Sequence, residues 1–218
     1  MLFLGMLQIK TFVFNPYQEN TYVIYDEHKN CLIIDPGMHH YQEESEFKAF
    51  IDEHQLKPTQ LINTHGHIDH VLGNNFVCDT YNLAPQFHEL ELPLVIEVQN
   101  YAPQMGIRYE PSPIPETFLT ETDRLYLGQE EFELILAPGH SPGHLCIYSA
   151  QHQFLIGGDV LFKGSIGRTD LPGGNHQQLL ESIASRIYQL PDETIVYPGH
   201  GPVTQVGEEK RSNPFVRG

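Results

Sequence analysis

The stretch Thr64-His65-Gly66-His67-Ile68-Asp69-His70 decides how the rest of this sequence is interpreted. Three histidines and one aspartate fall between positions 65 and 70, shortly after the apolar pair Leu61-Ile62. Imidazole and carboxylate groups are the usual ligands of zinc, iron and manganese, and they are seldom packed this densely without a cation to neutralise them. The stretch therefore predicts a metal site whose remaining ligands come from elsewhere in the chain.

Further candidate ligands each follow a predicted strand. Pro138-Gly139-His140, Gly157-Gly158-Asp159 and Pro198-Gly199-His200 are such turns, and Asp35 ends the strand predicted over 31–34. A rigid sheet positions the loops at its strand ends, so five strand ends can converge on one edge. Glycine before three of these residues suits tight turns near crowded ligands.

Each of these residues, considered by itself, could instead have a purely structural role. Asp69 alone would be a helix cap and Asp159 alone a turn residue. Lone histidines after turns are ordinarily solvated or capping, and six are interpreted in this way: His28, His39, His40, His54, His88 and His152. The joint pattern H-x-H-x-D-H followed by three strand-end ligands favours a metal site.

Composition limits the classes of function. The 218 residues carry a net charge of −16 and no basic cluster, which argues against nucleic acid as a partner. No stretch approaches the roughly 20 apolar residues of a membrane span. The short apolar start, residues 1–7, lacks a basic region and a cleavage site, so we do not expect a signal peptide. Cys31, Cys78 and Cys146 are few and far apart, which favours a reducing cytoplasm over a disulfide scaffold.

Hydrophobic periodicity predicts two β-meanders, each followed by helices. Expected strands cover 8–14, 20–25, 31–34, 60–63, 125–127, 131–137, 145–149, 153–156 and 194–197. Expected helices cover 41–55, 69–78 and 175–188, and 87–109 is helical with Leu90, Leu94, Val98 and Tyr101 on one face. Pro111 to Pro115 is a connector, a lid or a linker. We predict one α+β domain over 1–218, an αββα sandwich with two mixed sheets face to face and helices outside.

These residues resemble the metallo-β-lactamase-fold hydrolases. Asp35, the 64–70 stretch, His140, Asp159 and His200 occur in that family's order, and the resemblance covers nearly the whole chain. Within the family the chain is most similar to the short bacterial form of glyoxalase II, the hydroxyacylglutathione hydrolases. That similarity lies in Gly158-Asp159-Val160-Leu161-Phe162 and in residues 164–174 (GSIGRTDLPGG). The helical C-terminal substrate domain of longer glyoxalase II enzymes is expected to be absent.

The resemblance implies two divalent ions, zinc by preference, with iron or manganese also compatible with the donors. One would take His65, His67, His140 and Asp159, and the other Asp69, His70, His200 and the bridging Asp159. Asp35, and as a further candidate His144, would orient ligands by hydrogen bonding. Formal counting against both aspartates and a bridging hydroxide leaves about one positive charge, which favours an anionic substrate.

The implied reaction is hydrolysis of a thioester such as a hydroxyacyl-glutathione by a metal-bridged hydroxide, with Asp69 holding or accepting the water proton. Arg168 could contact a substrate carboxylate or pair with Asp170, and Gly201-Pro202 replaces the tyrosine that longer enzymes place after the last histidine. The alternative is a mononuclear-iron persulfide dioxygenase of the same fold, which would use the matches of His65, His140 and Asp159. A non-catalytic metal-binding protein is a third reading, and Asp69 argues against a β-lactamase. The sequence does not indicate the oligomeric state.

Overall fold

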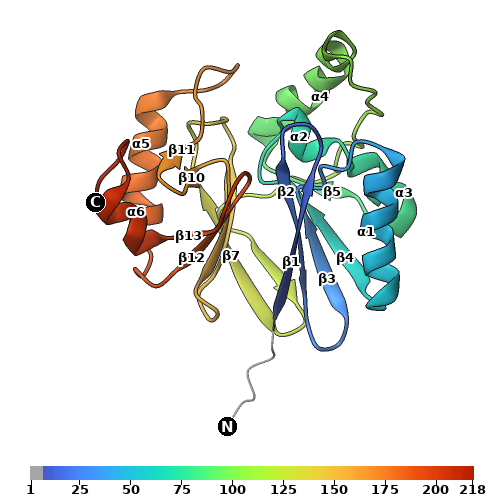
Figure 1. Ribbon diagram of the computed structural model, residues 1–218, viewed down its shortest axis with the longest axis horizontal. Helices are drawn as coiled ribbons and strands as arrows, with labels where there is room; N and C mark the ends of the chain where they lie inside the picture. Colours follow the sequence, from blue (N-terminus) through green and yellow to red (C-terminus); the bar gives the residue numbers. More distant parts are fainter. Residues whose placement is uncertain (1–6) are drawn as a thin grey trace.

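The computed structural model describes residues 7–218, so most of the expected short apolar start lies outside the described residues. Two mixed sheets form the centre of the molecule (Figure 1). The first has the order β1-β2-β3-β4-β5, with β3 parallel to β4 and β4 parallel to β5. Its strands are β1 (Gln8–Phe14), β2 (Glu19–Tyr25), β3 (Asn30–Ile34), β4 (Lys57–Ile62) and β5 (Pro85–Gln86).

The second sheet has the order β13-β12-β9-β8-β7-β6, with β9 and β12 parallel and the other neighbours antiparallel. Its strands are β6 (Arg124–Leu127), β7 (Glu130–Leu136), β8 (Leu145–Ser149), β9 (Phe154–Gly158), β12 (Ile195–Pro198) and β13 (Thr204–Gln205). A small hairpin, β10 (Leu161–Phe162) and β11 (Ser165–Ile166), follows β9.

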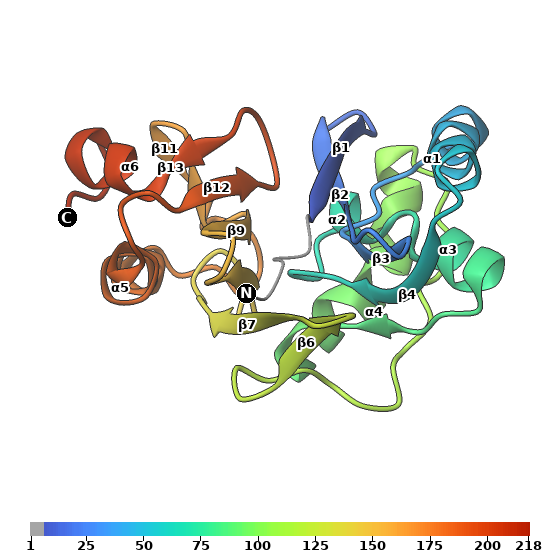
Figure 2. The same ribbon diagram turned by 90° about the horizontal axis from the view of Figure 1, so that it is seen from below.

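Helices cover the outer faces of both sheets. Figures 1 and 2 show α1 (Tyr41–Glu53) and α3 (Asn74–Tyr81) on the side of the first sheet, and α5 (His176–Ser185) and α6 (Val206–Ser212) on the side of the second. The remaining helices are α2 (Ile68–Val71), α4 (Leu92–Tyr101) and the 3₁₀ turns η1 (Glu89–Glu91), η2 (Ala102–Met105) and η3 (Ile187–Gln189). The predicted α+β sandwich of two mixed sheets with helices outside is confirmed.

Strand β3 shows why the layers stack in this way. Its side chains alternate between two faces, and both faces are buried. Cys31 and Ile33 pack in a cluster with Phe47 of α1, whereas Leu32 and Ile34 pack against the inner face of the second sheet. Full burial of each such aliphatic side chain contributes roughly 1.5–3 kcal/mol, so the alternation holds helix, sheet and sheet together.

Two sequence expectations about helices are wrong in detail. The helix expected over 69–78 is two helices, because Gly73 lies between them and donates its N–H to the Pro36 carbonyl at 2.7 Å. A Cβ at Gly73 would lie 2.8 Å from that carbonyl oxygen, so only glycine allows this approach.

The segment 87–109 also differs: Val98 is buried as expected, but the rest of the buried face lies one residue further along the chain. The buried positions are Glu91, Val95, Val98 and Ala102, and Leu90 is half exposed. Pro93 lies in the first turn of α4, where a missing N–H costs no hydrogen bond. The short elements β5, β10, β11, β13 and α6 carry too few residues for a periodic signal and were not predicted.

Within residues 7–218 no helix combines the length and the apolar character that crossing a membrane requires. Cys31, Cys78 and Cys146 are buried and unpaired.

Candidate metal centre

The strand ends bring the predicted site residues together at the end of the sandwich beside α2 (Figure 1). Parallel neighbours β3 and β4 end next to Asp35 and the 64–70 stretch, and parallel neighbours β9 and β12 end next to Asp159 and His200. Gly158 has φ +48°, and a Cβ there would collide with His144. This turn therefore requires glycine immediately before Asp159.

The first group of ligand atoms consists of three buried imidazoles, His65, His67 and His140. His140 Nε2 lies 2.8 Å from His67 Nδ1 and 3.2 Å from His65 Nε2. The other nitrogen of His140, Nδ1, donates to the Arg168 carbonyl at 2.7 Å. The Nε2 of His140 therefore carries no proton, and its lone pair points toward the two other nitrogens.

His65 has the same arrangement through a hydroxyl. Thr64 Oγ1 donates to Asp35 Oδ2 at 2.6 Å, so it accepts the Nδ1 proton of His65 at 3.0 Å. The Nε2 of His65 is then also a lone pair. Facing lone pairs repel each other unless a proton or a cation lies between them, and a metal ion accepts all three at once.

The second group consists of Asp69, His70 and His200. Asp69 Oδ2 lies 3.1 Å from His200 Nε2 and 3.7 Å from His70 Nε2. His200 donates its Nδ1 proton to the carbonyls of Tyr17 and Gln18, at 3.1 and 3.3 Å. When the ring is neutral, its Nε2 therefore faces the carboxylate as a second acceptor.

Asp159 lies between the two groups. Its Oδ2 is 3.5 Å from His140 Nε2 and 3.6 Å from His200 Nε2, and its Oδ1 is 3.6 Å from His70 Nε2. Three of the buried atoms here have no hydrogen-bond partner, namely His67 Nε2, His70 Nε2 and Asp159 Oδ1. Unpaired buried polar atoms are costly in free energy. Two of the three, His70 Nε2 and Asp159 Oδ1, face each other at 3.6 Å, and a cation between them would satisfy both. The His/Asp cluster thus fits a dinuclear metal site.

The charge states agree with this fit. Burial lowers the pKa of His67 to about 3 and that of His140 to about 4, so these ligands are neutral and free for metal at neutral pH. Burial also acts to lower the pKa of His70, but Asp69, Asp159 and Asp35 outweigh it and raise that pKa well above its usual value. Carboxylates that attract a proton to His70 attract a dication equally well.

Asp35 connects the two groups from behind. Its Oδ1 accepts the Thr64 N–H at 2.7 Å, and its Oδ2 accepts from Thr64 Oγ1 and from His70 Nδ1, the latter at 3.1 Å. It therefore fixes the ring orientation of His70 directly and that of His65 through Thr64. The residue has φ +49°, so the bend after β3 aims its carboxylate at both histidines.

His144, a candidate from the sequence, supports Asp159. Its buried Nε2 accepts the Asp159 N–H at 3.0 Å, and its ring stacks on that of His65 at 5.0 Å. Glu91 is a residue that sequence reasoning missed. It is fully buried and accepts the Gly66 N–H at 2.8 Å and the Gly143 N–H at 2.5 Å. Glu91 therefore ties the loop of His65 and His67 to the loop of His140.

Asn20, also missed from the sequence, holds the loop of His200. Its Nδ2 donates to the carbonyls of Pro198 and Gly201, each at 2.9 Å, and its N–H donates to the Gly199 carbonyl at 2.7 Å. The clue in the sequence is a polar Glu19-Asn20-Thr21 at the start of a strand that is buried throughout.

We expect Asn20→Asp to weaken binding of the ion at the second group by about 10- to 100-fold, because a carboxylate oxygen would replace the donor to two carbonyls. Affinity at the first group stays unchanged. Metal-buffered equilibrium dialysis measures both affinities, with the exposed Asn100→Asp as the matched control. Equal weakening at both groups would show a general loss of structure instead.

Removing the metal should make stability depend on pH. His65, His67, His140 and His144 all have pKa values lowered by burial, so they remain neutral in the folded protein. In the unfolded chain they take up protons below pH about 6.5. We therefore expect the free energy of unfolding of the metal-free protein to fall from pH 7 to pH 5, by about 2 kcal/mol for each imidazole that stays neutral.

The raised pKa values of His70 and His200 do not reverse this trend, because their contribution is complete below the unfolded value and is lost only as pH rises. Urea unfolding in chelator at pH 7, 6 and 5 measures the effect. A free energy that is constant or rises toward pH 5 would contradict it.

Arg168 lies beside the first group through its backbone, but its side chain points to a surface partner. The guanidinium binds Asp170 with two contacts of 2.7 Å, and most of the side chain is exposed. This ion pair accounts for the position of Arg168 in the structure. A contact with substrate stays a prediction.

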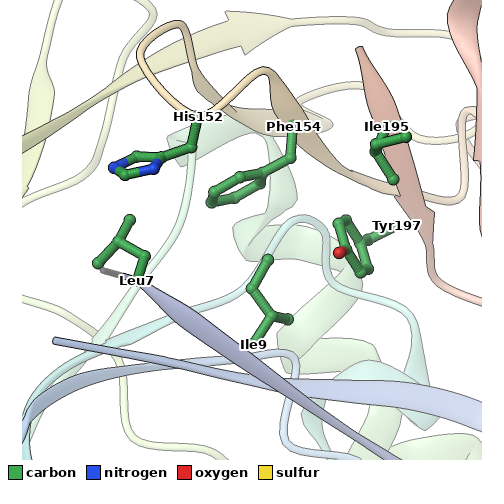
Figure 3. Close-up of a pocket in the computed structure, with 6 residues that line it drawn as sticks. All are labelled: Leu7, Ile9, His152, Phe154, Ile195 and Tyr197. Atoms are coloured by element: carbon green, nitrogen blue, oxygen red, sulfur yellow. The ribbon is translucent and has the colours of Figure 1, made fainter. Parts of the chain in front are cut away.

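A pocket of about 290 Å³ lies at the other end of the sandwich (Figure 3). It is lined by Leu7, Ile9, His152, Phe154, Ile195 and Tyr197. Phe154 and Ile195 begin the strands β9 and β12, whereas Asp159 and His200 follow the ends of these strands. His152, which Figure 3 shows among the lining residues, binds Glu130 at 2.8 Å. The pocket is therefore separate from the metal centre.

Comparison with curated proteins finds relatives of similar length. The chain is 36% identical over 204 residues to a protein of Bacillus subtilis described as "Probable metallo-hydrolase YqgX", covering 93% of this chain and 94% of that protein. It is 35% identical over 206 residues to "Hydroxyacylglutathione hydrolase GloC" of Haemophilus influenzae, covering 92% and 93%.

Comparison with solved structures gives the same architecture. "BLEG-1 B3 metallo-beta-lactamase" has a TM-score of 0.88 at 35% identity, covering 97% of this chain and 100% of that one. "TTHA1623 in a di-iron-bound form" has a TM-score of 0.85 at 36% identity, covering 95% and 100%. "ETHE1 from Myxococcus xanthus" has a TM-score of 0.77 at 25% identity, covering 95% and 83%.

The family model described as "Metallo-beta-lactamase superfamily" matches residues 14–200. That range runs from the end of β1 to His200, so it contains both groups of ligand atoms and every strand of the two sheets except β1 and β13. The architecture, the cluster and the match agree, and the chain belongs to the metallo-β-lactamase superfamily.

Proposed function

We propose that this protein is a dinuclear metallohydrolase that cleaves a small anionic thioester, such as a hydroxyacyl-glutathione. The observation that carries the proposal is the second group: Asp69, His70 and His200 converge independently of the three imidazoles of the first group. A chain that needed a single ion would not require these three side chains. The similarity to the GloC hydrolase of Haemophilus influenzae supports the thioester as substrate class.

This arrangement supports the ligand roles expected from the sequence. His65, His67 and His140 would hold one ion, Asp69, His70 and His200 the other, and Asp159 would bridge them. Two divalent ions, with zinc as the first choice, would supply an activated water and a Lewis acid for the thioester carbonyl.

The chain's own residues perform the remaining tasks. Asp69 has a side chain that is partly open to solvent and an oxygen 3.1 Å from His200, so it can accept the proton of an attacking water at the mouth of the site. Burial acts to raise the pKa of Asp69, but His70 and His200 outweigh it and lower that pKa, so Asp69 is ionised at neutral pH and can hold the attacking water as a hydrogen-bond acceptor. A thiolate leaves without a general acid, because an ordinary thiol pKa is about 8.5.

A mononuclear-iron persulfide dioxygenase is the second candidate. It is favoured by the likeness to the structure titled ETHE1 from Myxococcus xanthus, and the di-iron form of TTHA1623 keeps iron among the metals to be tested. His65, His140 and Asp159 would be the ligands of its single ion. We propose the reducing cytoplasm as the location, in agreement with the three unpaired cysteines.

The deciding experiment combines metal analysis with a substrate panel. Mass spectrometry of the purified protein counts zinc, iron and manganese per chain. The panel contains a glutathione thioester, other thioesters, a lactone and a β-lactam, the last because one similar structure is titled a β-lactamase. Two ions with thioester hydrolysis are expected. One iron per chain with rapid oxygen uptake on glutathione persulfide would overturn the hydrolase proposal.

A further inference from the structure

A second cluster of metal-binding side chains lies at the start of α1, outside both groups of the metal centre. It consists of His39, His40 and Glu43, and one ring nitrogen or carboxylate oxygen of each lies within 4.8 Å of those of the other two. His40 Nε2 is 3.7 Å from Glu43 Oε1, and the two imidazole rings are 5.5 Å apart. His40 stands at the extended N-cap position of α1 and His39 directly before it, so both rings lie at the start of the helix, where they can share one ion with Glu43.

The two histidines do not have the ordinary roles that the sequence suggested for them. His39 Nδ1 is buried and has no hydrogen-bond partner, so it is neither solvated nor satisfied. His40 stands at the N-cap position of α1, but its side chain makes no capping hydrogen bond. A buried nitrogen without a partner costs free energy, and a cation bound at that nitrogen would remove the cost.

Glu43 is held in a fixed orientation. Its Oε1 accepts the Asn15 N–H at 2.8 Å, and its Oε2 accepts the His39 N–H at 2.8 Å. Each oxygen keeps a further lone pair, since a carboxylate oxygen accepts two bonds. Hydrogen bonds of this kind orient carboxylate ligands in known metal sites.

From this geometry we infer that His39, His40 and Glu43 form a third metal-binding site, distinct from the dinuclear centre. Two imidazoles and one carboxylate are the donor set of Zn²⁺, Ni²⁺ and Cu²⁺, whereas Ca²⁺ and Mg²⁺ prefer all-oxygen sites. About half of the His40 side chain is exposed, so the ion would reach the site from solvent and complete its shell with water.

A helix-capping role of Glu43 does not explain the whole cluster. A glutamate near a helix start that accepts a backbone N–H is a common stabilising contact, and it accounts for Glu43 alone. It does not account for two imidazoles converging on the same carboxylate, one of them with a buried, unpaired nitrogen. The inference is independent of the hydrolase proposal, because it uses none of the residues of the metal centre.

The test uses the whole protein with its metal centre already filled with zinc. Zn²⁺ alone is then titrated by calorimetry, and Cu²⁺ alone is followed by electron paramagnetic resonance. We expect one additional ion per chain, weaker than the zinc of the centre, and nitrogen couplings from two imidazoles in the copper spectrum. His40→Ala should lower the affinity at least tenfold, and its exposed side chain makes removal safe for the fold.

His28→Ala is the matched control, since His28 is also exposed and lies 3.9 Å from an acid, Glu27, but has no second imidazole beside it. His39→Gln is the second test variant and should also lower the affinity. Because each variant is compared with wild type, the number of ions in the main centre does not affect the result. No additional ion in wild type, or equal affinity in the His40→Ala, His39→Gln and wild-type proteins, would overturn the inference.

Discussion

Asp69→Ala is expected to lower kcat/KM for thioester hydrolysis by about 10³-fold and to leave one metal ion per chain instead of two. Asp69 supplies the carboxylate that is specific to the second group, with its Oδ2 3.1 Å from His200 Nε2 and 3.7 Å from His70 Nε2. Without it, the second ion would have two neutral imidazoles and a share of Asp159. The proposed acceptor of the water proton would also be lost.

The measurement is metal content together with steady-state kinetics on a thioester. The fold should survive, because Asp69 is a side chain at the mouth of the site and not part of an apolar cluster. Asp79→Ala, at an exposed position of α3, is the matched control and should keep both ions and full activity. Near-full activity of Asp69→Ala with both ions retained would remove the two-metal mechanism.

His67→Ala is expected to abolish hydrolysis to a similar extent, on the order of 10³-fold, by removing the ion of the first group. His67 Nδ1 lies 2.8 Å from His140 Nε2, and its own Nε2 has no hydrogen-bond partner. The substitution removes only this contact with His140 and takes away one of the three converging ring nitrogens. The second group keeps all its ligands.

The two variants together test the assignment of ligands to groups. Cobalt substitution and its visible spectrum report which site remains in each variant, and the remaining sites should differ. His176→Ala, an exposed histidine at the start of α5, controls for the loss of an imidazole. If His67→Ala and Asp69→Ala lose the same ion, the two groups do not correspond to two separate sites.

The sequence alone predicted the sandwich because its signals are local. Alternation along a strand such as β3, the density of ligands from 64 to 70, and glycine before His140 and Asp159 are each readable within a few residues. The end of β3 just before Asp35 and the start of α1 at Tyr41 follow from the same kind of signal. The helix break at Gly73 does not, because it depends on contact with Pro36 from another part of the chain.

The shifted burial in η1 and α4 has the same cause. Periodicity placed Leu90 inward, but the burial of Glu91 is decided by two loops that need its carboxylate, at Gly66 and at Gly143. A buried acid with two N–H partners is favourable, while the same acid without them would be expelled to solvent. A single sequence does not show which partners will be present.

What the sequence by itself determined is therefore the set of candidate metal ligands and the architecture that carries them. Only the tertiary structure decided how these residues are grouped. His65 and His140 are 75 positions apart, and Asn20 reaches the loop of His200 across 178 and 181 positions. The tertiary structure likewise brought one ligand atom each of His39, His40 and Glu43 within 4.8 Å of one another. The sequence shows which side chains can donate a lone pair to a metal ion. Which of these lone pairs face one another depends on how the two sheets pack together, and no local sequence pattern contains that information.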